Sequence, residues 1–364
     1  MRNIIPEKEY YDTIMKKRML CITPDFTRSG APLALLGLLK IISKRDSHII
    51  DIMAYGNGEL YHLYKDLLGE DHVEILNGLT PTPEFRHRLQ NDPDIVLLNT
   101  AATLTFSFYY QNTDIPVYWW IHESPDLIKD SFPAFMNPHL LSPNFHLLVP
   151  SWGTSDLFYT HYSYKADILP APVFMPEYLL PDIAFEFPND RVLFLIPGAY
   201  SYIKGQDILL SAIHSLPDEY KKRSFFIFCG YTLEKQIEYK NAIYNAASDM
   251  NNVLMLEDQP QEILYSLMNR CQCIAAPSRI DCLPTTIAEG LMFEKICLIS
   301  SHTGISSYIK DCISGFVFSD SEELVKRLLL IIDDYESLHK IAAMGHKVYL
   351  DVFSPEAIEN TLMF

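Results

Sequence analysis

The sequence predicts an α/β protein built from two doubly wound domains. Short, uninterrupted apolar runs alternate with helix-length segments along the chain, which is typical of strands buried on both faces of a parallel sheet. At 364 residues the chain is longer than one hydrophobic core usually serves, so two domains are expected. Prolines cluster between the two halves, at positions 170, 172, 176, 181 and 188, and favour an extended linker there.

Each half of the chain contains six predicted strands. In the first half they are expected at 19–23, 48–53, 73–76, 94–99, 117–121 and 147–150. In the second half they are expected at 192–196, 225–229, 253–256, 273–276, 296–299 and 316–318. A helix is predicted at 33–43, and the pattern is helical from residue 321 almost to the end. We therefore expect domains at 1–170 and 191–350, joined by a linker at 171–190.

The composition describes a soluble globular protein, with 48% hydrophobic and 21% charged residues. A net charge of −17 argues against a nucleic-acid partner and against broad adhesion to anionic lipid. No apolar run approaches the roughly 18 to 20 residues of a membrane span, and the first residues lack the apolar core of a signal peptide. We expect a cytoplasmic protein, with peripheral contact at the inner face of the membrane left open and the oligomeric state unknown.

The cysteines and one acidic tract do not predict a metal site. Seven cysteines, an odd number, fit a reducing compartment. Cys271 and Cys273 form the only close pair, and buried free thiols are preferred to a zinc site, which needs two further ligands. The tract Asp92-Pro93-Asp94 begins a predicted strand, the end away from the expected ligand edge, and is interpreted as a turn.

One loop in the second half combines several polar groups. An apolar run at 273–277 predicts a buried strand that ends in a loop with Arg279 and Asp281. Pro284 stands where a first helical residue is expected, because its ring presets φ and its missing N–H would have no partner there. The helix would then begin with three unpaired N–H groups, those of Thr285, Thr286 and Ile287. With the helix dipole they predict an anion site.

A second carboxylate follows this loop, because seven residues separate Asp281 from Glu289. Amides and a cation are suited to phosphate groups, and carboxylates accept hydrogen bonds from hydroxyls. The order of strand, acidic loop, helix N-terminus and second carboxylate therefore favours a site for a phosphorylated polyol. An ordinary loop with two surface acids is the alternative, because short motifs have many false matches.

The spacing of Asp281 and Glu289 resembles the E-x7-E signature of the retaining glycosyltransferases of family 4 (group 1 glycosyltransferases), with aspartate in place of the first glutamate. The resemblance implies the GT-B fold, in which two doubly wound Rossmann-like domains face each other across a cleft. It also implies that Asp281 faces the donor sugar and that Glu289 holds the ribose of a nucleotide-diphosphate sugar. The donor site would further include Arg279, Pro284, Thr285 and Thr286.

A second part of the resemblance follows the first predicted strand of the second domain. Here the family has a glycine, an arginine and a lysine-glycine pair, and this chain has Gly198, Ala199, Lys204 and Gly205. Lys204 matches the phosphate-binding lysine, and we expect it to bind the diphosphate and to assist its departure. The arginine is replaced by Ala199, and Arg279 is expected to donate instead. A solvated loop lysine is the alternative for Lys204.

Two glycines are expected beside the donor. Gly304 lies in the loop 300–307, which is similar to the family's glycine loop after the strand that follows the E-x7-E helix. Gly30 lies in the turn 27–32, where the family has a glycine-rich turn that lets the backbone approach the diphosphate. A plain turn would have a similar sequence, so neither glycine is decisive.

A histidine and a glutamate follow the predicted strand at 117–121. In the family this histidine sits beside the donor sugar and the acceptor, so we expect His122 near the anomeric centre and Glu123 on the acceptor side. The alternative is a half-buried structural histidine, with Glu123 capping the next helix.

Together these features predict a retaining hexosyltransferase that needs no metal and no cofactor. The second domain would bind the donor and the first domain the acceptor, and a final helix at about 351–364 would pack back on the first domain. A front-face displacement fits better than a covalent intermediate, because no carboxylate of the signature is placed as a nucleophile. By family analogy the acceptor is a glycan, a lipid-linked sugar or a protein, in surface polysaccharide or glycoprotein biosynthesis.

Two other functions are alternatives. A catalytically inactive GT-B module, which binds a glycan or serves as a partner subunit, is favoured by Ala199 and Asp281. Lys204, Glu289 and His122 speak against it, because a scaffold does not need a phosphate cation together with a ribose acid. Glycosidase chemistry requires two carboxylates on one bond, whereas Glu289 is expected at the nucleotide end.

Overall fold

The computed structural model describes residues 16–76, 93–131, 139, 141–183 and 185–362. Asp92 of the acidic tract lies outside the described residues. The chain divides into two compact units, the first formed by residues 1–122, 128–148 and 363–364, and the second by residues 123–127 and 149–362. No helix in the described part of the chain is long and apolar enough to cross a lipid bilayer.

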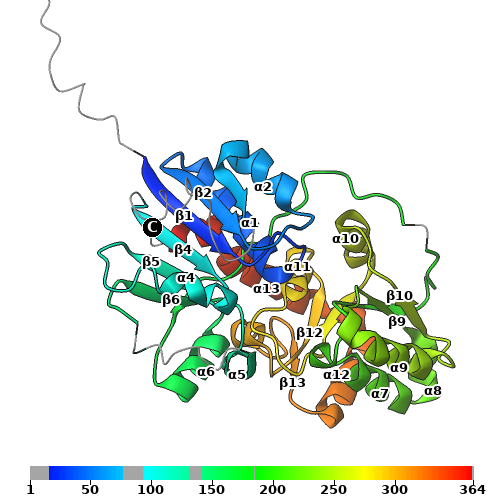
Figure 1. Ribbon diagram of the computed structural model, residues 1–364. Helices are drawn as coiled ribbons and strands as arrows, with labels where there is room; N and C mark the ends of the chain where they lie inside the picture. Colours follow the sequence, from blue (N-terminus) through cyan, green and yellow to red (C-terminus); the bar gives the residue numbers. More distant parts are fainter. Residues whose placement is uncertain (1–15, 77–92, 132–138, 140, 184, 363–364) are drawn as a thin grey trace, which may run out of the picture. The chain divides into compact units, whose positions relative to one another are not determined.

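The first sheet has seven strands in the order β3-β2-β1-β4-β5-β6-β7 (Figure 1). They are β1 (Lys17–Thr23), β2 (His48–Ala54), β3 (Val73–Ile75), β4 (Ile95–Asn99), β5 (Val117–Trp120), β6 (Phe145–Val149) and β7 (Asp167–Ile168). Neighbouring strands from β3 to β6 run parallel. The six strands predicted for this half are confirmed, whereas β7, with two residues, is too short to give a sequence pattern.

Helices connect these strands. They are α1 (Gly30–Lys44), α2 (Tyr61–Leu68), η2 (Glu70–His72), η3 (Ala101–Thr103), α4 (Leu104–Ser107), α5 (Pro125–Ser131) and α6 (Trp152–Tyr162). The predicted helix at 33–43 forms the interior of α1. Nine of its 15 residues are buried, in a run from Ala34 to Ile42 that only Lys40 interrupts, as expected for a helix that is covered on more than one side.

The second sheet has six strands in the order β10-β9-β8-β11-β12-β13, all in parallel. They are β8 (Val192–Pro197), β9 (Ser224–Cys229), β10 (Val253–Leu256), β11 (Cys273–Ala276), β12 (Ile296–Ser300) and β13 (Phe316–Phe318). All six predicted strands of the second half are confirmed. The expected fold class, with two parallel-sheet α/β parts, is therefore confirmed as well.

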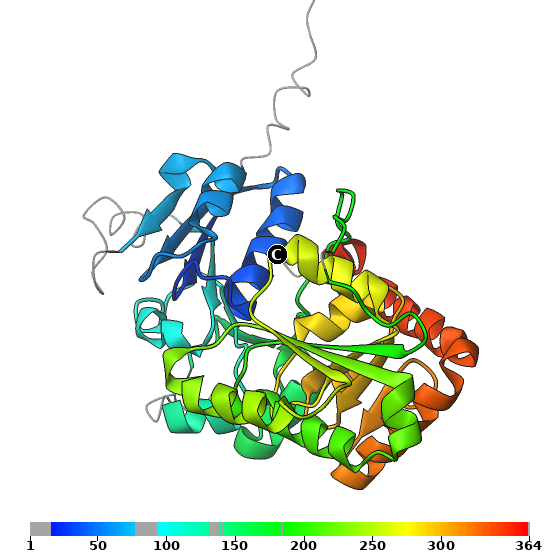
Figure 2. The same cartoon turned by 90° about the vertical axis from the view of Figure 1, so that its right-hand side faces the viewer.

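The second unit is rich in helices. They are η5 (Tyr202–Lys204), α7 (Gln206–Ser215), α8 (Asp218–Arg223), η6 (Glu234–Gln236), α9 (Ile237–Ala247), α10 (Gln261–Arg270), α11 (Thr285–Met292), η7 (Gly304–Tyr308), α12 (Ser321–Asp334), η8 (Tyr335–Leu338), α13 (His339–Val348), η9 (Tyr349–Phe353) and α14 (Pro355–Thr361). These helices cover both faces of the sheet, and Figure 2 shows α7 and α9 on the opposite side of the strands from α10.

Both faces of the second sheet are buried. On one face Phe194 stacks on Phe226, with ring centroids 4.6 Å apart, in a core shared with α7, α9 and α12. On the other face Leu195 packs in a core shared with α10 and α11. Because successive residues of a strand point to opposite faces, burial of both faces requires a continuous apolar run, which is the pattern that made β8 recognisable.

The continuous part of the second unit begins at Val149, upstream of the predicted linker at 171–190. The cause is α6, which packs on η7. Ser151, the residue before α6, accepts a hydrogen bond from the Thr154 N–H. The Tyr308 hydroxyl of η7 donates to the Pro150 carbonyl at 3.3 Å. Packing of a final helix on the first domain stays a prediction, and residues 363–364 lie outside the described part.

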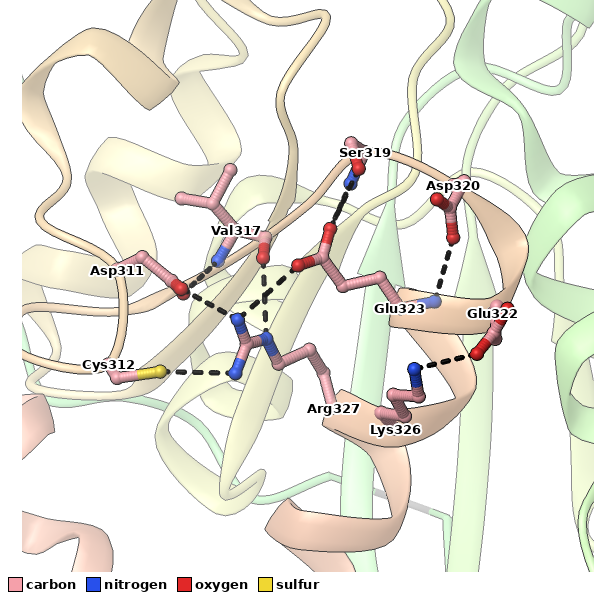
Figure 3. A network of polar contacts seen from close by, with 9 residues as sticks. All are labelled: Asp311, Cys312, Val317, Ser319, Asp320, Glu322, Glu323, Lys326 and Arg327. Atoms are coloured by element: carbon pink, nitrogen blue, oxygen red, sulfur yellow. Dashed lines mark hydrogen bonds and ion pairs between the residues drawn. The ribbon is translucent and has the colours of Figure 1, made fainter.

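A polar network fixes the start of α12 (Figure 3). The Asp320 side chain accepts the Glu323 N–H at 2.8 Å, which satisfies a helix-terminal donor. Arg327 donates to the Asp311 carboxylate at 2.6 Å and to the Cys312 sulfur at 3.1 Å. The network ties the turn before β13 to the helix after it.

Gly205 places the loop after β8 against the loop after β11. It has a φ of +68°, and a Cβ atom there would lie 2.1 Å from the Pro277 carbonyl oxygen. Only glycine adopts this backbone conformation at low cost while leaving room for that oxygen. Gly205 thus permits the close approach of two loops that both carry predicted site residues.

Gly205→Ala is expected to lower the free energy of unfolding by roughly 2 to 4 kcal/mol, because both backbone strain and a steric clash arise. The measurement is urea denaturation of the two purified proteins. Gly30→Ala is the matched control: no described atom lies within 4 Å of a Cβ at Gly30, so a change under about 1 kcal/mol is expected. Equal effects of the two substitutions would contradict the role given to Gly205.

Candidate functional site

The centre of the candidate site in the second unit is an ion pair between Lys204 and Asp281. Strands β8 and β11 are parallel neighbours, so the loops that follow them lie at the same edge of the sheet. There the Lys204 ammonium donates to the Asp281 carboxylate at 2.5 Å, with side chains 35% and 13% exposed. Burial alone would lower the pKa of Lys204, but the charge and hydrogen bond of Asp281 outweigh it and raise the pKa. Lys204 is therefore a charged, partly shielded cation.

Arg279 is held by a second acid. Its guanidinium donates to both carboxylate oxygens of Asp207, at 2.8 and 2.6 Å, and lies 3.9 Å from the ring centre of Tyr202. The backbone N–H of Arg279 donates to the Ile203 carbonyl at 2.7 Å. The hydrogen bonds to Asp207 raise the pKa of Arg279. Because Asp207 engages this guanidinium in two hydrogen bonds, the expected contact of Arg279 with a diphosphate stays a prediction.

The loop that carries Asp281 is also held from its other side. The Gly304 N–H donates to the Asp281 carbonyl at 2.7 Å, and the Ser151 hydroxyl donates to the Cys282 carbonyl at 3.0 Å. A Cβ atom at Gly304 would lie 2.1 Å from that same carbonyl oxygen. The Gly304 amide is thus used within the chain, and its role beside a donor stays a prediction.

The start of α11 differs from the sequence-based expectation. Pro284 precedes the helix instead of opening it, because its ψ of 98° is extended and α11 begins at Thr285. The Ile287 N–H donates to the Pro284 carbonyl at 3.0 Å, so the prediction of three unpaired amides was wrong at Ile287. Among the described residues, the N–H groups of Thr285 and Thr286 have no hydrogen-bond partner, and these two keep the character of an anion site.

Glu289 lies half-buried in the second turn of α11. One of its carboxylate oxygens, Oε1, accepts hydrogen bonds from the Tyr265 hydroxyl and the Gln261 amide, each at 3.2 Å. Burial raises the pKa of Glu289 to about 7, although these two hydrogen bonds act in the opposite direction. The acid is therefore divided between its neutral and ionised forms near neutral pH.

In the first unit, His122 is oriented by Asn99, a residue that the sequence analysis did not single out. The fully buried Asn99 donates its amide to the Thr23 hydroxyl at 3.1 Å and to the Ala31 carbonyl at 3.2 Å. Its carbonyl oxygen must therefore face the His122 Nε2 atom, 2.9 Å away, which donates as Nε2–H. Burial lowers the pKa of His122 to about 3, so the imidazole is neutral at physiological pH.

The remaining predicted residues lie close to these groups within each unit. Gly30 is the first residue of α1 and directly precedes Ala31, which accepts from Asn99. Glu123 belongs to the second unit. The pKa of the Cys282 thiol is raised most by burial, then by the charge of Asp281, and then by the charge of Glu123. Glu123 therefore lies near the Asp281 loop, and its place on an acceptor side stays a prediction.

The part of the chain that the structure describes contains no cluster of side chains suited to bind a metal ion. There, no group of three His, Cys, Asp or Glu side chains is arranged to hold an ion. Cys271 and Cys273 are buried free thiols, and the Asp94 carboxylate accepts the Arg18 N–H at 2.8 Å. Metal independence itself stays a prediction.

Asn99→Asp is expected to raise the pKa of His122 by about 2 units, because a carboxylate beside Nε2–H favours the imidazolium. The measurement is an NMR titration of the histidine ring signals in both proteins, with the exposed His214 as internal reference. An unchanged titration of His122 in folded protein would contradict the contact with Asn99.

Comparison with known proteins bears on the second unit and on the fold. Residues 183–348 match the family model described as group 1 glycosyl transferases. Among curated proteins the sequence finds no match.

Solved structures extend the likeness to almost the whole chain. HepE from Anabaena, solved with UDP and glucose, is 16% identical with a TM-score of 0.73, over 94% of this chain and 97% of HepE. Sucrose-phosphate synthase from Thermosynechococcus elongatus is 12% identical with a TM-score of 0.73, over 95% and 97% of the two chains. A glycosyltransferase from Rickettsia africae is 17% identical with a TM-score of 0.70, over 95% and 96%. The predicted resemblance is thus confirmed: the chain has the GT-B fold, and its residues 183–348 match the group 1 glycosyl transferases.

Proposed function

We propose that the protein is a retaining glycosyltransferase that moves a sugar from a nucleotide-diphosphate sugar to a glycan, lipid-linked or protein acceptor. One observation carries the proposal: Lys204, Asp281 and Glu289 all follow the carboxyl ends of neighbouring strands β8 and β11 in one unit. The match to group 1 glycosyl transferases supports glycosyl transfer. The HepE structures with UDP and with UDP-glucose support a nucleotide-sugar donor.

The charges of the second unit suit a diphosphate leaving group. Within the chain, Asp281 forms an ion pair with Lys204. An arriving diphosphate would attract the ammonium, together with the open amides of Thr285 and Thr286, and would release the Asp281 carboxylate to accept hydrogen bonds from sugar hydroxyls. Groups preorganised for developing negative charge lower the barrier to departure of that diphosphate.

A neutral His122 suits the sugar side of the reaction. The Asn99 contact fixes the proton on Nε2, and an uncharged ring beside the anomeric centre would leave the positive charge of the transition state undisturbed. No carboxylate is proposed as a nucleophile, so retention would follow from front-face displacement. The proposal needs no metal, keeps the expected cytoplasmic location, and assigns the acceptor to surface polysaccharide or glycoprotein biosynthesis by analogy.

The alternative is a catalytically inactive GT-B module that binds a glycan or a partner subunit. Two observations favour it: Ala199 replaces the family's arginine, and Arg279 is engaged by Asp207. A panel of UDP-, GDP- and TDP-sugars, followed by ligand-observed NMR, separates the two functions. Binding of one donor with slow release of free sugar is expected for the enzyme, whereas silence across the panel in folded protein would leave the inactive module.

Lys204→Ala is expected to lower the rate of donor hydrolysis or transfer about 10- to 150-fold, the effect of losing a charge-assisted hydrogen bond of about 1.5 to 3 kcal/mol. The measurement is the initial rate with the donor that binds. Lys326→Ala is the control, since Lys326 is exposed on α12 and pairs with Glu322. Equal rates for the two variants would argue against a diphosphate at Lys204.

A further inference from the structure

The two donors to Glu289 come from one side of a single helix. Gln261 and Tyr265 lie four residues apart on α10, so their side chains project in the same direction. Both reach the same oxygen, Oε1, at 3.2 Å. Two hydrogen bonds to one oxygen fix the plane of the carboxyl group as well as its position.

The other oxygen of Glu289 is left open. Among the described residues, no hydrogen bond or ion pair reaches Oε2. Oε2 is not among the buried side-chain atoms that lack a partner in the described structure, so it is open to solvent and can accept hydrogen bonds from a ligand. A carboxylate oxygen accepts two hydrogen bonds, which matches the two adjacent hydroxyls of a vicinal diol.

The surroundings of Glu289 supply no counter-charge in the described structure. The titratable side chain that touches Glu289 is Tyr265. Tyr178 lies nearby: its pKa is raised most by burial, then by the charge of Glu262, and then by that of Glu289. On the other sides of α11, Cys297 and His346 contact the carbonyls of Ile287 and Leu291. The ionised form of Glu289 therefore depends on its two neutral donors from α10.

We propose that Gln261 and Tyr265 are positioning residues that hold Glu289 by one oxygen and thereby present the other to the ribose diol of the donor nucleotide. The inference rests on the proposed function, because it requires a nucleotide at Glu289. It goes beyond that function by assigning ribose selectivity to α10. The pair would favour nucleotides with both ribose hydroxyls over their 2′-deoxy forms.

The test is the pH dependence of nucleotide affinity. UDP and GDP are titrated calorimetrically between pH 5.5 and 9 with wild type, Tyr265→Phe and Gln261→Ala. Either substitution removes a donor that stabilises the carboxylate, so the pKa of Glu289 rises and more of the acid is protonated at pH 7. We expect affinity about 5-fold weaker at pH 7, as for one lost hydrogen bond, and largely restored at pH 9. The pH midpoint of affinity should move upward in both variants.

Tyr220→Phe is the matched control, because Tyr220 on α8 donates its hydroxyl to the exposed Asp333. It should leave the midpoint unchanged. A merely structural role of Tyr265 would weaken binding equally at all pH values and would overturn the proposal. If Tyr265→Phe does not fold, Gln261→Ala, a change at the half-buried first residue of α10, is judged by the same shift of the pH midpoint.

Nucleotides without the 2′-hydroxyl provide a second, independent test of the inference. The 2′-deoxy form of the bound nucleotide is expected to bind more weakly to wild type, and the difference should shrink in Tyr265→Phe. Equal affinity for the deoxy form, or a preference for TDP, would overturn the inference while leaving a glycosyltransferase. Absence of any nucleotide binding would instead refute the proposed function.

Discussion

The candidate site depends on the adjacency of β8 and β11 at the centre of the second sheet. In a parallel sheet the loops after neighbouring strands meet at one edge, so a lysine and an aspartate that are 77 residues apart in sequence form an ion pair. Gly205 permits this meeting, because any side chain there would collide with the Pro277 carbonyl. The Arg279 N–H then joins the two loops through the Ile203 carbonyl.

The charged groups at this edge of the sheet have different partners. Arg279, always protonated, is committed to Asp207 and to the ring of Tyr202. Lys204 pairs instead with Asp281, and in the proposed function a diphosphate would take the place of this carboxylate. Glu289 has no cation partner in the described structure, and burial raises its pKa to about 7. Arg279 thus holds the two loops together, whereas Lys204 is the cation that we propose for the diphosphate.

The position of the loop that carries Asp281 also depends on the segment 149–162, which precedes the Pro-rich stretch. Ser151 and Thr154 donate to the Cys282 carbonyl, directly beside Asp281. Gly153 packs against Gly304, and a Cβ atom at Gly153 would lie 3.2 Å from the Gly304 Cα. The loop with Asp281 is therefore positioned from three sides, by segments that follow β6, β8 and β12.

The sequence by itself determined the twelve longer strands and the fold class, because burial on both faces of a parallel sheet imposes continuous apolar runs. It also predicted Lys204, Asp281 and Glu289 as site residues, from local spacing and from the family resemblance. Tertiary structure alone decided which side chains touch these groups. Asn99, Gln261 and Tyr265 lie in ordinary strand and helix patterns, and their contacts with His122 and Glu289 span 23 to 28 residues. The pairing of the Ile287 amide likewise depends on the backbone angles of Pro284. The sequence rule that puts proline at the first helical position starts α11 one residue too early, at Pro284 instead of Thr285.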